Sequence, residues 1–140
     1  MYKKSFLLLT LCFVSSLLAG DLKQEQAKYQ KMKKASLEKH RKQNPELTQL
    51  RTKIKELSQE MMQLAISISP EIANAEADQR WTILVEKMDE ITAKSSDFKS
   101  VYEARKKAYE EISEILHLLD PKLKEQGKRT WEAKQESSNI

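Results

Sequence analysis

Apolar residues recur along much of the chain at alternating spacings of three and four, the pattern of one helix face. Segment 46–68 keeps this spacing throughout, and segment 71–94 continues it with fewer apolar positions. Segment 97–119 carries a wider stripe, as expected for a helix that touches two partners. Three helices of similar length are therefore predicted. Their stripes are Leu47, Leu50, Ile54, Leu57, Met61, Leu64 and Ile68; Ala77, Trp81, Leu84, Met88 and Ile91; and Phe98, Val101, Tyr102, Ala108, Tyr109, Ile112, Ile115, Leu116 and Leu119.

Helix starts are marked by a residue that can cap a helix, followed by proline. The pairs are Asn44-Pro45, Ser69-Pro70 and Asp120-Pro121. A side-chain oxygen accepts a free backbone N–H at a helix start, and proline at the first helical position lacks the N–H that would stay unpaired. A fourth start without proline is predicted at Ser95–Asp97. The predicted helices are 22–43, 46–68, 71–94, 97–119 and a short 122–134.

These elements predict an all-α fold: an antiparallel bundle of three main helices with a basic N-terminal helix. Trp131 is expected to dock the short last helix, and 135–140 to be mobile. An alternative stays open because the apolar spacing runs through Ser95 without interruption. A single helix over 71–119 would make a long hairpin folded at Ser69-Pro70, and its partly uncovered stripe would require a homodimer.

Composition agrees with helices and excludes other classes. The 140 residues include only 2 glycines, 3 prolines and 1 cysteine, while 33% are charged. So few turn-forming residues argue against a multi-stranded sheet, a sandwich or a barrel. One thiol cannot build a disulfide framework or a zinc ribbon.

The first twenty residues have the pattern of a secretory signal peptide. Lys3 and Lys4 precede an uncharged, mostly apolar run over 5–19, and the small pair Ala19-Gly20 closes it. The run is shorter than the roughly 20 residues of a bilayer span. Cleavage is expected near Gly20, with an uncleaved anchor or lipidation at Cys12 as alternatives. The predicted parts are a signal peptide (1–20), a basic helix (21–43), a helical core (44–120) and a short helix with a tail (121–140).

Positive charge concentrates directly after this leader. Segment 22–43 holds eight basic residues, whereas 21–43 holds three acidic ones, so this stretch nets +5 and residues 44–140 net −3. Such a segment can bind an acidic protein partner, an acidic polymer or an anionic membrane surface. Nucleic acid is disfavoured because the leader directs the chain away from it. The candidate binding residues are Lys28, Lys31, Lys33, Lys34, Lys39, Arg41 and Lys42.

No arrangement of side chains indicates catalysis, and neither an enzyme activity nor a cofactor is expected. The chain has no glycine-rich phosphate loop, and its serines are not set in a nucleophile elbow. Glu114 and His117 share a helix face, but ligation of a di-metal centre needs paired copies of that spacing. Met61, Met62 and Met88 suggest a soft metal site, although two of them fall on apolar stripes.

Residues Leu47-Thr48-Gln49-Leu50-Arg51 are similar to the Leu-Thr-x-x-Gln motif of the periplasmic stress chaperones of the Spy/CpxP type. Arg51 stands where that family has Gln, and no second Leu-Thr pair follows the leader. The resemblance covers these five residues and the general helical architecture. It implies a dimeric cradle that shields unfolded client proteins.

The sequence therefore predicts a non-enzymatic interaction or chaperone-like protein of the bacterial envelope, periplasmic or secreted after cleavage. One alternative is a sensor of a metal or small ligand that uses His117, Glu114 or the methionines. The other is a structural spacer that dimerises by coiled-coil packing.

Overall fold

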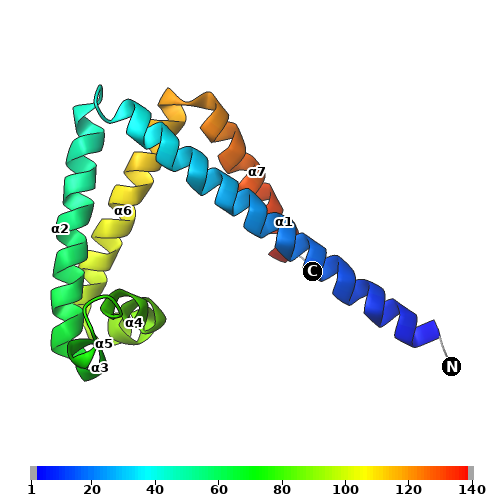
Figure 1. Cartoon of the computed structure of the whole chain (residues 1–140), viewed down its shortest axis with the longest axis horizontal. Helices are drawn as coiled ribbons and strands as arrows, with labels where there is room; N and C mark the ends of the chain where they lie inside the picture. The colour runs from blue at the N-terminus through cyan, green and yellow to red at the C-terminus, as the bar shows by residue number, and fades with distance from the viewer. Residues whose placement is uncertain (1–2, 139–140) are drawn as a thin grey trace. The chain divides into compact units, whose positions relative to one another are not determined.

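A computed structural model describes the backbone of residues 3–138 and the side chains of residues 20–138. Over this range the chain is all-α, with seven helices and no strand (Figure 1), which confirms the predicted fold class. Among the described residues, no helix has the length and hydrophobicity that a membrane span requires. The helices are α1 (Lys3–His40), α2 (Pro45–Ile68), α3 (Pro70–Asn74), α4 (Arg80–Glu86), α5 (Met88–Lys94), α6 (Ser96–Leu119) and α7 (Pro121–Ser138).

The chain divides into two compact units. Residues Asn44–Ser113 form one unit, called the central unit, with α2 to α5 and most of α6. The residues up to Gln43 and those from Glu114 onward form the other, called the terminal unit, with α1, the end of α6 and α7. The predicted helical core ended at residue 120, whereas the central unit ends at Ser113.

Three of the predicted helix starts carry the side-chain hydrogen bond that was expected of them. Asn44 Oδ1 accepts the backbone N–H groups of Glu46 and Leu47, at 3.0 and 3.3 Å. Asp120 Oδ1 accepts the N–H of Leu123 at 3.2 Å. The Ser95 hydroxyl accepts the N–H of Phe98 at 3.1 Å. Ser69 occupies the cap position of α3 without such a bond.

The break at Ser95 excludes the long hairpin. Its backbone is extended, with φ −138° and ψ 116°, so α5 ends there and α6 begins at Ser96. A single helix over 71–119 would need helical dihedrals at this residue. The uninterrupted apolar spacing was misleading here because the local hydroxyl cap stops the helix.

Segment 71–94 is three short helices and not the one helix that was predicted. After α3 the backbone carbonyls of Ala73 and Ala75 accept hydrogen bonds from the Arg80 guanidinium, at 3.3 and 3.1 Å. The side chain of Arg80 therefore supplies donors that a continuing helix would have supplied from its backbone. Ala77 and Trp81, predicted on the buried stripe, are both exposed.

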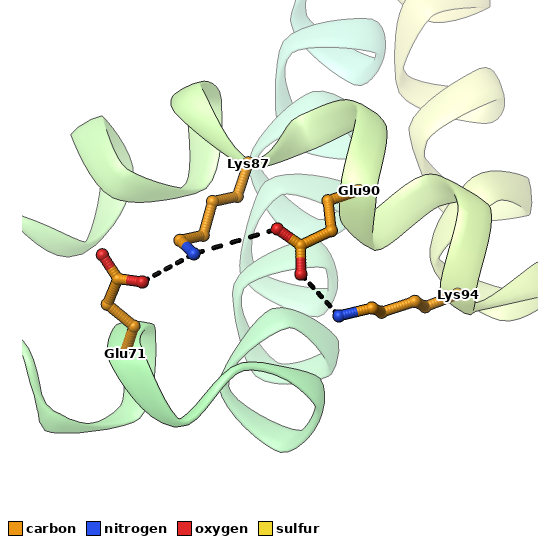
Figure 2. A network of polar contacts seen from close by, with 4 residues as sticks. All are labelled: Glu71, Lys87, Glu90 and Lys94. Atoms are coloured by element: carbon orange, nitrogen blue, oxygen red, sulfur yellow. Dashed lines mark hydrogen bonds and ion pairs between the residues drawn. The ribbon is translucent and has the colours of Figure 1, made fainter.

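The second interruption, at Lys87, lies beside a network of ion pairs (Figure 2). Lys87 Nζ lies 2.6 Å from a carboxylate oxygen of Glu71 on α3 and 3.8 Å from one of Glu90 on α5. Glu90 also pairs with Lys94, at 2.5 Å. These charges raise the pKa of Lys87, chiefly through Glu71, and lower the pKa of Glu90, chiefly through Lys94. The network joins α3 to α5 across the break.

The hydrophobic core of the central unit takes side chains from all five of its helices. Burial of one such side chain contributes roughly 1.5–3 kcal/mol relative to exposure. Met61 is buried in this core and Met62 and Met88 are half-buried against it, so packing accounts for all three of these methionines. The buried cluster is Met61, Ala65, Ile72, Leu84, Ile91 and Phe98.

In the terminal unit, α1 and α7 lie side by side and antiparallel (Figure 1). Tyr29 of α1 lies against Gly127 of α7, whereas the earlier Glu25 contacts Thr130, which is later in α7. The prediction was a short helix that ends at 134, followed by a mobile tail over 135–140. Helix α7 extends to Ser138, so this prediction is wrong for residues 135–138. Asn139 and Ile140 of that tail lie outside the described residues, as do Met1 and Tyr2 of the leader.

Trp131 does not dock α7 as was predicted. Its side chain is 61% exposed, and the buried residues of α7 are Leu123 and Gln126. The face of α7 that is turned inward therefore mixes apolar and polar residues.

Candidate functional site

The predicted basic residues do not all lie on one exposed face of α1. Lys33 and Arg41 are half-buried, and Arg41 pairs with Glu38 at 2.9 Å. Burial lowers the pKa of Lys33. The exposed members are Lys28, Lys31, Lys34, Lys39 and Lys42, and we call this set the basic surface.

Another face of α1 is turned inward, which leaves these lysines exposed. Its half-buried or buried residues recur at spacings of three and four, as in a two-helix coiled coil. They include two polar residues, Glu25 and Ser36, which a search for apolar stripes passes over. This inward face is Leu22, Glu25, Tyr29, Met32 and Ser36.

Polar contacts fill the seam between α1 and α7. The Gln126 side-chain amide donates to the Glu25 carboxylate, and Gln126 is itself buried. The Thr130 hydroxyl lies 3.3 Å from the Glu25 carbonyl oxygen and 2.9 Å from that of Gln126. Buried polar groups that are paired in this way fix the register of two helices.

A second polar contact joins α1 to the end of α6. The hydroxyl of Tyr29 lies 2.9 Å from Nε2 of His117, and the two rings meet edge to face with centroids 6.0 Å apart. The pKa of His117 is lowered, mainly by burial and then by the charges of Lys33 and Lys124. His117 is therefore held as a neutral ring near neutral pH.

Gly127 of α7 lies directly against this pair. A Cβ atom at this position would stand 3.1 Å from Cε2 of Tyr29 and 3.3 Å from Cε1 and Nε2 of His117. Sequence reasoning missed this site. Its signal was a glycine inside a helix, where glycine costs about 1 kcal/mol relative to alanine and therefore needs a packing reason.

Asp120, at the start of α7, faces the basic helix. Burial raises its pKa, but the hydrogen bond from the N–H of Leu123 and the charge of Lys39 contribute to a larger opposite effect, and the net shift is downward. Asp120 therefore stays ionised over the ordinary pH range.

Glu114 and His117, named for the alternative of a metal or ligand sensor, do not form a common site. Glu114 is exposed, while the Nε2 atom of His117 lies against the Tyr29 hydroxyl. Among the side chains of residues 20–138, no group of three or more His, Cys, Asp or Glu is placed to hold a metal ion.

The two units carry opposite net charges. In the terminal unit without its first twenty residues, 21–43 have 8 basic and 3 acidic side chains and 114–140 have 5 of each, which gives +5. In the central unit, 10 basic and 13 acidic residues give −3. The excess of positive charge found along the sequence therefore belongs to one folded unit, and residues 21–43 supply this +5.

Comparison of the chain with protein-family models, curated proteins and solved structures found no match.

Proposed function

We propose that the protein is a non-enzymatic, chaperone-like interaction protein of the bacterial envelope that binds an acidic partner through the basic surface. Its support is that α1 is anchored on α7 by the polar seam while five lysines remain exposed. The backbone of a lysine on an anchored helix has a fixed position, so less conformational entropy is lost when a partner binds.

A compartment outside the cytoplasm forms part of this proposal. The contacts described between α1 and α7 involve residues from Glu25 onward, so cleavage near Gly20 would leave them in the mature chain. Mass spectrometry of the protein isolated from its native cells tests this point. A mass that begins at Gly20 or Asp21 supports secretion, and an intact N-terminus without lipid contradicts cleavage.

The test of binding replaces lysines without removing α1, because deletion of the helix would also expose α7. The variant carries Lys28, Lys31 and Lys34 as glutamine. Vesicles of anionic lipid serve as the probe, since each lysine near such a surface contributes about 1 kcal/mol. We expect about a hundredfold weaker binding, which corresponds to roughly 3 kcal/mol.

A matched control removes the same charge from another helix of the terminal unit. Lys122, Lys128 and Lys134 of α7 are exposed, and their replacement by glutamine changes the net charge equally. Equal loss of binding in both triple variants would show that only total charge matters. No binding of the unaltered protein to anionic vesicles, but capture of an acidic envelope protein, would identify the partner as a protein.

Exposed apolar side chains of the same unit support the chaperone-like part of the proposal. In the terminal unit, Leu118 is 81% exposed, Trp131 is 61% exposed and Leu119 is 42% exposed. Such residues can hold unfolded clients. Light scattering of a reduced, aggregating client protein should rise more slowly with the unaltered chain than with a Leu118→Asn, Trp131→Ser variant.

A further inference from the structure

A second charged feature lies in the central unit. The guanidinium carbon of Arg105 on α6 is 5.1 Å from the ring centroid of Trp81 on α4 and 4.9 Å from that of Tyr109. Nε of Arg105 donates to the Ser58 hydroxyl on α2 at 2.8 Å, and Nη2 donates to the Tyr109 hydroxyl at 3.3 Å. Side chains from three helices thus hold this one cation.

These contacts fix the guanidinium before any ligand arrives. Two ring contacts and two hydrogen bonds restrict a side chain that would otherwise lose rotamer freedom on binding. An arginine carries five N–H donors in a planar fork. Contacts with described residues use two of these five donors, so three donors remain for a ligand.

Arg105 has no carboxylate partner in the part of the chain that the structure describes. Its neighbours one turn away on α6 are Val101, Tyr102, Ala108 and Tyr109, and none of these is acidic. The ion pairs of the central unit lie elsewhere, in the network of Lys87. The guanidinium is thus half-buried and lacks a described counter-ion, although the net charge of the central unit is −3.

The two aromatic side chains that contact the guanidinium are partly open to solvent. Trp81 is 37% exposed and Tyr109 is 40% exposed. Val85, one turn after Trp81 on α4, is 55% exposed. Tryptophan, tyrosine and arginine are the residues that most often contribute strongly to protein interfaces.

We propose that Arg105, Trp81 and Tyr109 form a binding site for a carboxylate group on a partner protein, with Val85 contacting an apolar residue beside it. The guanidinium fork binds the two carboxylate oxygens as a bidentate pair. The negative central unit disfavours anions in general, so binding here depends on local geometry and not on net charge. The carboxylate can belong to an acidic side chain or to the C-terminus of the partner.

The test uses the full chain with Trp131→Phe, which leaves Trp81 as its one tryptophan. Trp81 fluorescence is followed while short peptides are added. The probes are acetyl-Leu-Glu-Leu-amide, its Gln counterpart, and acetyl-Leu-Gln-Leu with a free carboxyl terminus. We expect the Glu peptide to bind about tenfold more tightly than its Gln counterpart. If the peptide with the free carboxyl terminus binds tightly and the Glu peptide does not, the site recognises the C-terminus of a partner.

Substitutions then separate the site from general electrostatics. Arg105→Gln and Arg105→Lys should both weaken binding of the favoured peptide by about tenfold, because lysine keeps the charge but loses the fork. Lys106→Gln removes an adjacent exposed charge and should change binding less than twofold. The proposal fails if Lys106→Gln weakens binding as much as Arg105→Gln, or if all three peptides bind alike.

A separate measurement tests whether the Arg105→Lys variant still folds. The circular dichroism spectrum of Arg105→Lys should match that of the parent chain. If Arg105→Lys is folded and still binds the Glu peptide at full strength, the bidentate carboxylate site is wrong.

Discussion

The hydroxyl of Tyr29 lies 2.9 Å from Nε2 of His117, although 88 positions separate the two residues in the sequence. Gly127 lies against both rings, so three segments of the terminal unit meet at one point. This point joins α1 to the end of α6 and to α7, and it holds the basic helix in place. The contacts at this point can be tested by measuring the unfolding free energy of variants, without knowledge of a partner.

Removal of the Tyr29 hydroxyl should destabilise the terminal unit. Tyr29→Phe leaves Nε2 of His117 without its partner in a half-buried setting, and the expected cost is about 1 kcal/mol of unfolding free energy. Urea denaturation followed by circular dichroism measures it. Tyr102→Phe, whose hydroxyl has no described hydrogen bond, should change the unfolding free energy by less than about 0.5 kcal/mol.

Alanine at position 127 should not give the usual benefit of replacing a helical glycine. That benefit is about 1 kcal/mol in an open helix, but the new Cβ would press on the Tyr29 and His117 rings. We expect Gly127→Ala to be destabilising in the parent chain. In a background with both Tyr29→Ala and His117→Ala, which removes both rings, the same change should be stabilising, and an effect of Gly127→Ala that is equal in the two backgrounds would contradict the packing role.

Acid should weaken the terminal unit through His117. Because the folded-state pKa of His117 lies below its ordinary value of 6.5, the unfolded chain binds more protons between those two values. The contribution of the neutral His117 ring to the unfolding free energy is therefore complete above pH 6.5. It is lost as the pH falls from 6.5 to the lowered pKa of the folded state. The thermal midpoint should fall over this window, and His117→Gln should flatten the slope. An unchanged slope in that variant would assign the effect to other groups.

The two serine caps of the central unit should respond differently to alanine. Ser95→Ala removes the hydrogen bond to the Phe98 N–H and should cost about 1 kcal/mol. Ser69→Ala removes no such bond and should cost less than about 0.5 kcal/mol. Denaturant midpoints of the two variants check this, and equal losses would show that the Ser95 cap contributes little.

Helix starts were predictable from the sequence because a cap is local chemistry. Asn44, Ser95 and Asp120 each accept an N–H two or three residues later, so a few residues contain the whole signal. The all-α class followed in the same way from apolar spacing and from the scarcity of glycine and proline.

The interruptions inside 71–94 could not be predicted because tertiary contacts stabilise them. Neither glycine nor proline marks residues 75–79 or Lys87, and the apolar spacing runs across both positions. Arg80 reaches the carbonyls of Ala73 and Ala75, and Glu71 of another helix pairs with Lys87.

The inward face of α1 was missed for a different reason. A search for apolar residues passes over Glu25 and Ser36, which face inward. Partner residues from the far end of the chain, such as Gln126, make a polar residue suitable there. The same arrangement turns Lys33 inward and removes it from the binding residues that the sequence suggested.

The terminal unit is assembled from one stretch that precedes the central unit and one that follows it, which sets the order in which the fold can be completed during synthesis. The central unit is one continuous stretch and has all of its residues once Ser113 is made. The basic helix is made before the central unit and its partner α7 is made after it, so the two must close a loop that spans the whole central unit. A nascent or C-terminally truncated chain therefore presents α1 without its seam partner, with Glu25 and Tyr29 uncovered beside the lysines.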